Sequence, residues 1–371
     1  MTKTNDENYG IAKIADLQPV DAPDLPYQPQ DPQSYRPRIG LIGCGGVTVH
    51  HLRVYKEAGY DVVALCDIDS SKAQERQQKF YPQAQVYSDY RDLLNRADIE
   101  VVDIATHPRE RVEIIETALK TGKHVLSQKP FVLDLDQGER LADLADSQGV
   151  QLAVNQNGRW APHFSYMRQA MAAGMIGEVL SAHLSVHWDH SWVCGTEFEN
   201  MRHLILYDFG IHWFDMVNCF MGDKNALKVY ASIQRSCNQK ARPAMLAHAV
   251  MDFDGAQASL IFNGDTRFGP QDGTYISGTA GTMTSVGPDL MEQRVTLYNQ
   301  HGYCSPVLEG HWFPQGFHGA MGELLCAIEQ SRTPINNARD NLKTLALCFA
   351  AVASAEQGQA IVPGACRKMT E

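Results

Sequence analysis

The chain has 371 residues, and because a single domain usually takes roughly 100–200 residues, we expect two domains. With 44% hydrophobic and 20% charged residues, and no apolar run near the ~18 residues that cross a bilayer, the composition is that of a folded soluble protein rather than a disordered or membrane-spanning one. A net charge of −11 disfavours a general nucleic-acid binder, so we expect neither nucleic acid nor a membrane as a partner.

The first ten residues are polar and acidic, without the basic and apolar stretches of a secretory signal. The nine cysteines are scattered and include no C-x-x-C pair. An odd number without zinc spacing indicates reduced thiols, so we expect a cytoplasmic protein.

Residues 1–37 differ from the rest because they hold six of the 17 prolines. Such a segment favours extended conformations and builds no regular helix. Its apolar residues favour an arm that lies along a neighbouring surface, and the alternative is a free tail. The apolar residues are Ile11, Ile14, Leu17, Leu25 and Tyr27.

Residues 38–155 alternate short apolar runs with amphipathic segments, which predicts βαβ units and a parallel sheet. The expected strands are 38–42, 61–66, 101–105, 124–127 and 151–155. The expected helices are 47–58, 71–80, 109–120 and 134–147.

Residues 156–371 form a different pattern, in which strand-like runs follow one another with Gly and Asp between them. This is typical of an α+β domain with a large, open, mostly antiparallel sheet. The expected strands are 179–187, 228–234, 247–253, 256–263, 273–278 and 293–298, and the expected helices are 162–174, 319–330 and 341–356. The predicted fold class is therefore α/β followed by α+β.

A glycine-rich turn follows the first expected strand: Gly43, Cys44, Gly45, Gly46, Val47 and Thr48. The first glycine permits a tight turn, the second lets the backbone approach a pyrophosphate, and the next helix offers free N–H groups. Thr48 departs from the Gly or Ala usual at the third position, but the strand before and the helix after predict a Rossmann dinucleotide site.

Asp67 ends the second expected strand, and Ile68 follows it. A carboxylate there accepts hydrogen bonds from an adenosine ribose and repels a 2′-phosphate, which favours NAD over NADP. Arg76 is a base nine residues after Asp67 and weakens this preference.

Lys129 lies just beyond the carboxyl end of an expected parallel strand, in the segment His-Val-Leu-Ser-Gln-Lys-Pro at 124–130. Ligands bind at this edge of α/β sheets, so we expect a functional lysine. The alternative is a solvated surface lysine.

Asp208 and His212 are four residues apart, and on a helix they share a face. A carboxylate one turn away fixes the tautomer of an imidazole and makes it a general base. The alternative is a capping aspartate and a core histidine.

Aromatic and polar side chains that suit a sugar-like ligand gather around this motif. We expect a substrate wall from Trp160, His187, Trp188, Trp192 and Tyr207 together with Lys129, Asp208 and His212. Packing in the core is the alternative, and a metal at the His-x-Asp-His cluster is disfavoured because its spacing is not a metal signature.

These segments together resemble the Gfo/Idh/MocA family of oxidoreductases over about residues 38–360. The turn at 43–48 is similar to the family's GCGGIA, the segment at 124–130 to its HVLCEKP, and Asp208 and His212 match its D-x-x-x-H motif. Gln128 replaces the family's Glu, which removes a negative charge near the nicotinamide.

Two further segments carry the resemblance. Asn157, Arg159 and Pro162 look like the family's N-x-R-x-x-P segment. The loop Thr106, His107 and Pro108 is similar to a cofactor loop of the family, although Arg111 stands where the family has a histidine. The resemblance thus assigns Thr106, His107, Pro108, Gln128, Lys129, Asn157 and Arg159, beside the glycine turn, Asp67 and Ile68, to cofactor binding.

The resemblance implies reversible hydride transfer between NAD(P) and a secondary alcohol of a sugar, glycoside or cyclitol. We expect His212 to accept the proton, Asp208 to orient His212, and Lys129 to bind the reacting oxygen, with exchanged Lys129 and His212 roles as the alternative. The tail around 316–323 is similar to that of enzymes that oxidise carbon 3 of a pyranose.

Two other functions stay open: a glycosidase or lyase that retains NAD and eliminates an aglycone, and a dinucleotide-sensing regulator. A homo-oligomer is expected because an open sheet with one apolar face needs a cover, and the Pro-rich arm is similar to arms that embrace a neighbouring subunit in the family.

Overall fold

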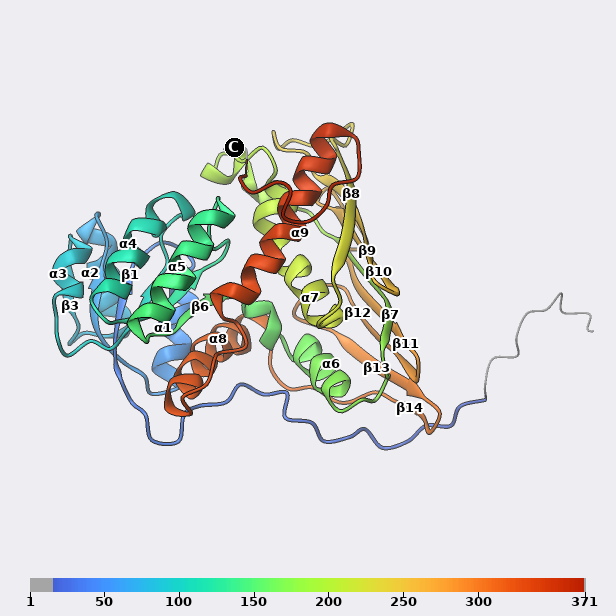
Figure 1. Ribbon diagram of the computed structural model, residues 1–371, viewed down its shortest axis with the longest axis horizontal. Coiled ribbons are helices and arrows are strands. Elements are labelled where there is room, and N and C mark those ends of the chain that lie inside the picture. Colours follow the sequence, from blue (N-terminus) through green and yellow to red (C-terminus); the bar gives the residue numbers. More distant parts are fainter. Residues whose placement is uncertain (1–15, 370–371) are drawn as a thin grey trace, which may run out of the picture.

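A computed structural model describes residues 16–369 of the chain, which fold around two sheets (Figure 1). The first is a six-stranded parallel sheet with the order β3-β2-β1-β4-β5-β6. Its strands are β1 (Arg38–Ile42), β2 (Asp61–Cys66), β3 (Gln85–Tyr87), β4 (Val101–Ile104), β5 (His124–Gln128) and β6 (Leu152–Asn155). The strand order reverses between β1 and β4, which is where such sheets bind ligands.

Helices cover both faces of this sheet, so β4 and β6 are buried along their whole length. The helices between its strands are α1 (Thr48–Glu57), α2 (Ser70–Phe80), α3 (Tyr90–Leu94), α4 (Pro108–Lys120) and α5 (Leu135–Gln148). The predicted Rossmann fold is confirmed, with β3 and α3 as additions that the sequence pattern did not reveal.

The second sheet has eight strands in the order β14-β13-β12-β11-β7-β10-β9-β8. Its strands are β7 (Val179–His187), β8 (Ala226–Gln234), β9 (Leu246–Phe253), β10 (Ala256–Asn263), β11 (Gln271–Gly278), β12 (Gly281–Gly287), β13 (Arg294–Asn299) and β14 (Gly302–Cys304). All neighbours pair antiparallel except β7 and β10, which are parallel. The predicted, mostly antiparallel sheet is therefore confirmed, and the parallel pair β7 and β10 makes it a mixed sheet.

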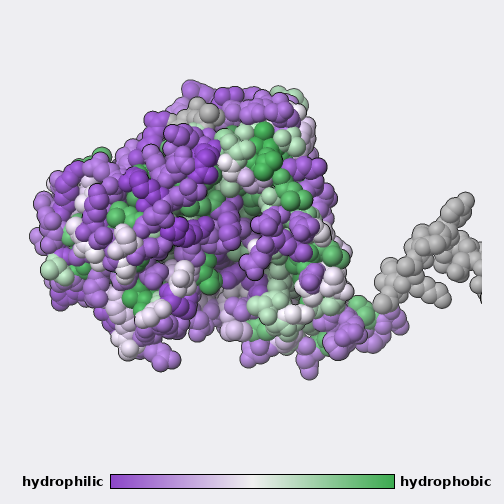
Figure 2. Space-filling model, in the orientation of Figure 1, coloured by the Kyte–Doolittle hydropathy of each residue, from purple (hydrophilic) through white to green (hydrophobic). Residues whose placement is uncertain are grey.

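One face of this sheet is covered by helices, and the other is open. The covering helices are α6 (Pro162–Ala172), α7 (Ile211–Met221) and α9 (Ala338–Gln357). The short η1 (Asn157–Trp160) precedes α6, and the short turns η2 (Ser191–Val193), η3 (Glu197–Asn200) and the π-helical η4 (Ile205–Phe209) lie in the connection after β7. Exposed apolar side chains alternate along the open face: Leu180, Leu227, Tyr230, Val250, Ile261, Tyr275, Val286 and Tyr298. Figure 2 shows a largely hydrophilic surface with hydrophobic residues gathered on the side where this sheet lies. The homo-oligomer that would cover this face stays a prediction.

Helix α8 (Trp312–Glu329) belongs to the C-terminal part of the chain but packs on the first sheet's domain. Phe317, Met321, Leu324 and Leu325 share one hydrophobic core with residues of β1, β2 and α1. The two domains are therefore joined by a common core rather than by a linker alone.

The described part of the N-terminal arm, residues 16–37, runs along this chain's own body under both domains (Figure 1). Val20 N–H donates to Tyr303 O at 2.9 Å, and Tyr303 N–H donates to Gln18 O at 3.0 Å, beside β14. At its other end, the Glu329 carboxylate accepts the backbone N–H groups of residues 33–35. The arm thus lies on a surface, as expected, while its exchange between subunits stays a prediction and the anchors Ile11 and Ile14 lie outside the described residues.

Within residues 16–369, we find no helix of the length and apolar character needed to cross a bilayer.

Candidate active site

The glycine-rich turn joins β1 to α1 and leaves open space above it. Gly43 has φ +91°, and a Cβ there would lie 2.8 Å from the Ala105 carbonyl carbon, so the turn requires glycine. A Cβ at Gly45 or Gly46 would meet no atom within 4 Å. The Thr48 hydroxyl donates to Gly45 O at 2.7 Å, which explains how a threonine fits the third position of the motif.

The carboxylate of Asp67 lies against the same turn. It accepts the N–H of Cys44 at 2.7 Å and the N–H of Asp69 at 2.9 Å. Arg76 reaches the turn from α2, with Nη2 3.4 Å from Gly45 O, and it also pairs with Glu75 at 2.6 Å. An acid and a base therefore flank the turn.

A cleft of about 640 Å³ runs along this edge of the sheet, and its walls suit a dinucleotide. Gly43, Gly45 and Asp67 line it together with Ile68, Thr106 and His107. Ile68 is 95% exposed and offers an apolar surface for a base, and the Thr106 hydroxyl is buried without a partner. The open glycines, the acid and the apolar face fit NAD in this cleft.

Arg111 replaces the family's histidine in a structural role. Its guanidinium is 1% exposed and donates to the carbonyls of Thr106, Gln128 and Pro130. Burial lowers the pKa of Arg111 to about 10. Arg111 therefore ties the loop after β4 to the loop after β5.

Lys129 leaves the end of β5 and pairs with Asp208 of η4. Its Nζ lies 3.0 Å from the Asp208 carbonyl oxygen and 3.3 Å from Oδ1. The two side chains are 18% and 9% exposed, and the Lys129–Pro130 peptide is cis. The structure therefore joins two of the three expected catalytic residues in an ion pair that is largely shielded from water.

His212 lies on α7, next to this pair. Burial lowers the pKa of His212 well below its usual value, and the charge of Lys129 lowers it further. Its Nδ1 is buried without a hydrogen-bond partner. The ring is therefore a neutral imidazole.

The expected orientation of His212 by Asp208 stays a prediction, since His212 Nδ1 has no hydrogen-bond partner among the described residues. The residues between them do not form one α-helix, because Ile205–Phe209 is a π-helix in which Gly210 N–H donates to Ile205 O at 2.7 Å. Asp208 pairs with Lys129.

Two of the residues assigned to the cofactor are structural. Arg159 is 3% exposed, and its guanidinium is bound by the carboxylates of Asp215 and Asp340 at 2.6–2.7 Å. The Asn157 side-chain oxygen accepts the indole N–H of Trp312 at 3.0 Å. Neither side chain lines the cofactor cleft.

Trp160 is likewise a core residue and not a substrate wall. It is 7% exposed and packs on α8, where a Cβ at Gly319 would lie 2.1 Å from its Cγ. Asn157, Arg159 and Trp160 follow the motif in sequence, but their side chains pack where η1 meets α8 and α7.

Aromatic rings link the end of β7 to His212. The Trp188 ring lies 5.7 Å from that of Trp213, which is 5.7 Å from Trp312, which in turn is 5.6 Å from His212. Trp213 was not expected in the site, although it directly follows His212 in the sequence.

The other expected wall residues are spread apart. His187 ends β7 and is half-buried, whereas Trp192 is 54% exposed and packs on Phe198 and Phe209. Over residues 16–369, no three His, Cys, Asp or Glu side chains come together as a metal site would require.

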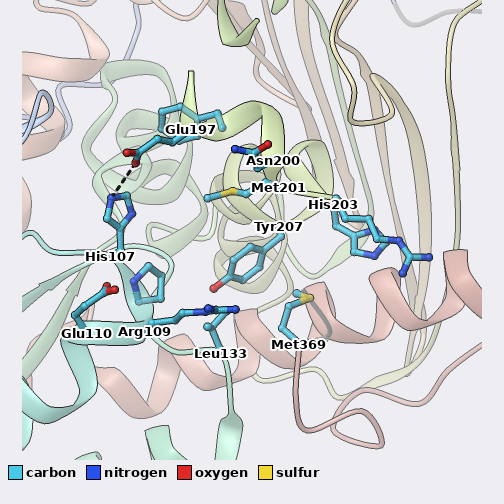
Figure 3. Close-up of a pocket in the computed structure, with 13 residues that line it drawn as sticks. His107, Arg109, Glu110, Leu133, Glu197, Asn200, Met201, His203, Tyr207 and Met369 are labelled. Carbon is cyan, nitrogen blue, oxygen red and sulfur yellow. Dashed lines mark ion pairs between the residues drawn. The ribbon is translucent and has the colours of Figure 1, made fainter. Parts of the chain in front are cut away.

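A pocket of about 430 Å³ adjoins the cofactor cleft, with which it shares His107 and Glu110 (Figure 3). Tyr207 points into it, next in sequence to Asp208, and its hydroxyl is buried without a partner. Burial raises the pKa of Tyr207, so the phenol keeps its proton. His107 Nε2 and Glu197 Oε2 face each other 3.8 Å apart at one end. The other walls are mainly apolar and come from several distant segments, which no single motif revealed: Leu133, Phe198, Met201 and Met369.

Comparisons with known proteins agree with this geometry. Residues 37–156 match the model described as oxidoreductase family, NAD-binding Rossmann fold, and residues 164–284 match the Gfo/Idh/MocA C-terminal domain. The D-apiose dehydrogenase of Paraburkholderia graminis is 27% identical over 86% of this chain and 88% of its own length. An inositol 2-dehydrogenase/D-chiro-inositol 3-dehydrogenase of Lactiplantibacillus plantarum is 30% identical over 55% of this chain and 58% of its own length.

Solved structures share the fold over nearly the whole chain. An oxidoreductase from Agrobacterium radiobacter in complex with NAD⁺, L-tartaric acid and magnesium has a TM-score of 0.79 at 22% identity, covering 89% of this chain and 99% of that one. A levoglucosan dehydrogenase in complex with NADH and levoglucosan has a TM-score of 0.77 at 19% identity, covering 89% of this chain and 100% of that one. Because both domains match models of one family, in the expected order, this chain belongs to the NAD-binding Gfo/Idh/MocA family of oxidoreductases.

Proposed function

We propose that this enzyme oxidises a secondary hydroxyl of a sugar, glycoside or cyclitol to a ketone, with carbon 3 of a pyranose as the favoured position. The observation that carries the proposal is the grouping of Lys129, Asp208 and neutral His212 beyond the carboxyl end of β5. Relatives named for D-apiose and inositol oxidation support the substrate class.

The chain's own residues account for the proton and the reacting oxygen. The Lys129 ammonium, held by Asp208, donates a hydrogen bond to the substrate oxygen and stabilises its alkoxide character. His212, a neutral imidazole, accepts the hydroxyl proton. NAD, when bound in the cleft, supplies the acceptor for the hydride that leaves the carbinol carbon. The C–H and O–H bonds break as the C=O bond forms.

The pocket beside Tyr207 supports a glycoside as substrate. Its volume of about 430 Å³ and apolar walls offer room for an apolar substituent next to the reacting sugar.

The same pocket also supports a second candidate function. An enzyme that retains NAD and eliminates an aglycone after transient oxidation needs room for the leaving group, and this pocket offers that room. The two functions differ in whether NADH accumulates in solution.

The test is NADH formation with NAD, and separately with NADP, across free sugars, inositols and aryl glycosides. We expect His212→Ala to lower kcat by about 10²–10⁴-fold. The control is His183→Ala, because His183 lies on the open sheet face and bonds only Ser259 among the side-chain contacts described. Turnover of His212→Ala near the control value would overturn the assignment, and aglycone release without NADH would favour the second function.

A further inference from the structure

A buried chain of polar groups lies behind Lys129. It consists of Asp103 at the end of β4, His51 on α1 and Gln128 at the end of β5, which are 0%, 0% and 6% exposed. We call these three residues the relay. The His51 Nδ1 lies 2.6 Å from Asp103 Oδ2, and its Nε2 lies 3.0 Å from Gln128 Nε2. Gln128 Oε1 in turn accepts the backbone N–H of Lys129 at 2.7 Å.

The two ends of the relay fix the direction of every hydrogen bond in it. The Lys129 backbone N–H can only donate, so the atom of Gln128 that faces it is the amide oxygen. The amide nitrogen of Gln128 therefore faces His51 and donates to Nε2. His51 must carry its proton on Nδ1, where the Asp103 carboxylate accepts it.

Two further donors agree with this direction. The Tyr55 hydroxyl donates to Asp103 Oδ2 at 2.7 Å, and burial raises the pKa of Tyr55 well above its usual value, so the donor proton is retained. The Asn155 amide lies with Nδ2 3.3 Å from His51 Nε2. Two amide donors on one ring nitrogen leave no place for a second ring proton.

The relay holds the peptide from which the Lys129 side chain starts. Arg111 binds the carbonyls of Gln128 and Pro130 from the other side. The backbone around Lys129 is thus bound before and after the residue, and Nζ reaches Asp208 at 3.0 Å. A catalytic group held in this way loses little freedom when substrate binds.

We propose that His51 is a positioning residue of the reaction: it is a neutral imidazole protonated on Nδ1, and through Gln128 it fixes the Lys129 backbone. The part that concerns the reaction rests on the proposed function. Gln128, rather than the Glu of the family pattern, is the residue that a neutral His51 requires.

Gln128→Glu replaces the amide donor that faces His51 Nε2 with a carboxylate acceptor. A carboxylate oxygen would then face that nitrogen and would need an N–H from it, so His51 takes a second proton between two carboxylates, that of Asp103 and the one introduced by the substitution. The other groups against the ring are the Tyr55 hydroxyl, the Asn155 amide, the Phe317 ring at 4.5 Å and the neighbouring His50, whose pKa is lowered mainly by burial. None of these supplies another negative charge.

The first experiment is nitrogen-15 NMR of the full chain labelled at histidine, which reports tautomer and protonation without substrate. The His51 signal is assigned by its loss in His51→Leu. We expect a neutral Nδ1–H ring at pH 7 in the wild type and an imidazolium in Gln128→Glu. An imidazolium or an Nε2–H ring in the wild type would overturn the proposal.

The second experiment separates positioning from stability. We expect His51→Leu to lower kcat by up to about 10²-fold, with a smaller change in the KM for NAD, and His51→Gln, which keeps one donor and one acceptor, to recover part of the loss. His50→Leu is the matched control, because His50 contacts the rings of Phe313 and Phe317 and makes none of the hydrogen bonds that build the relay. An unchanged kcat for folded His51→Leu would refute the positioning role.

The two proposals fail in different ways. If no sugar, glycoside or cyclitol is oxidised by the wild type, the proposed function fails, while the NMR result still decides the state of His51. A crystal structure of His51→Leu then decides positioning without activity. Lys129 Nζ still within hydrogen-bond distance of Asp208, with its backbone unmoved, would overturn the role of the relay.

Discussion

Gly45→Ala tests the dinucleotide site with little disturbance of the fold. A Cβ there meets no protein atom within 4 Å, and the backbone has no positive φ, so the variant should fold as well as the wild type. The methyl group would occupy the space through which a pyrophosphate approaches the turn. Loss of one charge-assisted hydrogen bond costs about 1.5–3 kcal/mol, which weakens NAD binding by roughly 10- to 100-fold.

The assay is thermal and urea unfolding with and without NAD. NAD at about 100 times its Kd stabilises the wild type by ~2.7 kcal/mol, and a tenfold weaker Kd leaves about 1.4 kcal/mol of this at the same concentration. Without NAD, Gly45→Ala and the wild type should unfold together. Equal stabilisation of both proteins by NAD would refute the placement of the pyrophosphate over Gly45.

Gly43→Ala is the contrasting variant. Gly43 has φ +91°, and a Cβ there would lie 2.8 Å from the Ala105 carbonyl carbon, so the substitution should lower the stability of the fold itself. The left-handed conformation alone costs about 1–2 kcal/mol. Gly43→Ala should therefore unfold earlier even without NAD.

Three other predictions concern buried or bound charges. Burial raises the pKa of Asp272 to about 8. The protonated carboxyl therefore stabilises the fold fully below about pH 4, and this stabilisation is lost as pH rises through about 8. Asp272→Asn should remove up to roughly 4 kcal/mol of the decline in urea-unfolding free energy between about pH 5 and 8. The Trp188 indole acts against this shift, but neither carboxylate oxygen of Asp272 has a hydrogen-bond partner, and a flat profile would contradict the buried neutral acid. The backbone N–H groups of residues 33–35 lower the pKa of Glu329 to about 2, so the arm contact is present at neutral pH and is lost as pH falls towards 2. Limited chymotrypsin digestion should cut Glu329→Gln after Tyr35 faster than the wild type, and equal rates would contradict this contact. Arg159→Met leaves two carboxylates without their buried partner and should cost about 3–5 kcal/mol in urea unfolding, partly restored by Asp215→Leu in the same chain, and a loss below about 1 kcal/mol would show that the ion pair is not needed.

The order of elements was predictable from the sequence because burial on both faces forces long apolar runs in a parallel sheet. Short elements were not: β3 has three residues and α3 has five, too few to show a period. Helix α8 begins at Trp312 rather than at the expected residue 319, since its glycines argue against a helix. They are required by packing, because a Cβ at Gly316 would lie 2.7 Å from Asn157 O and one at Gly322 would lie 2.4 Å from Gln30 O.

The position of a site residue was predictable where a motif fixes the backbone. The partner of its side chain was not, because it depends on which groups the fold brings next to it. The glycine turn, Asp67 and Lys129 lie at the carboxyl edge of the sheet as expected. The direction of Asp208 depends on a π-helical turn, which has no sequence period of its own. The pairing of Arg159 with Asp215 and Asp340 was not predictable, because these partners lie 56 and 181 positions away in the sequence.

The N-terminal arm makes the order of synthesis matter. The residues of the arm are synthesised well before their partners: Tyr27 bonds Glu309, which is made 282 residues later, and Gln33 bonds Glu329, 296 residues later. The parallel-sheet domain can fold while the chain is still growing, since domains fold as units. The arm, however, must wait on the nascent chain until β14 and α8 have emerged. Its docking therefore follows the synthesis of β14 and α8, and a chain that ends before them leaves residues 16–37 without these contacts.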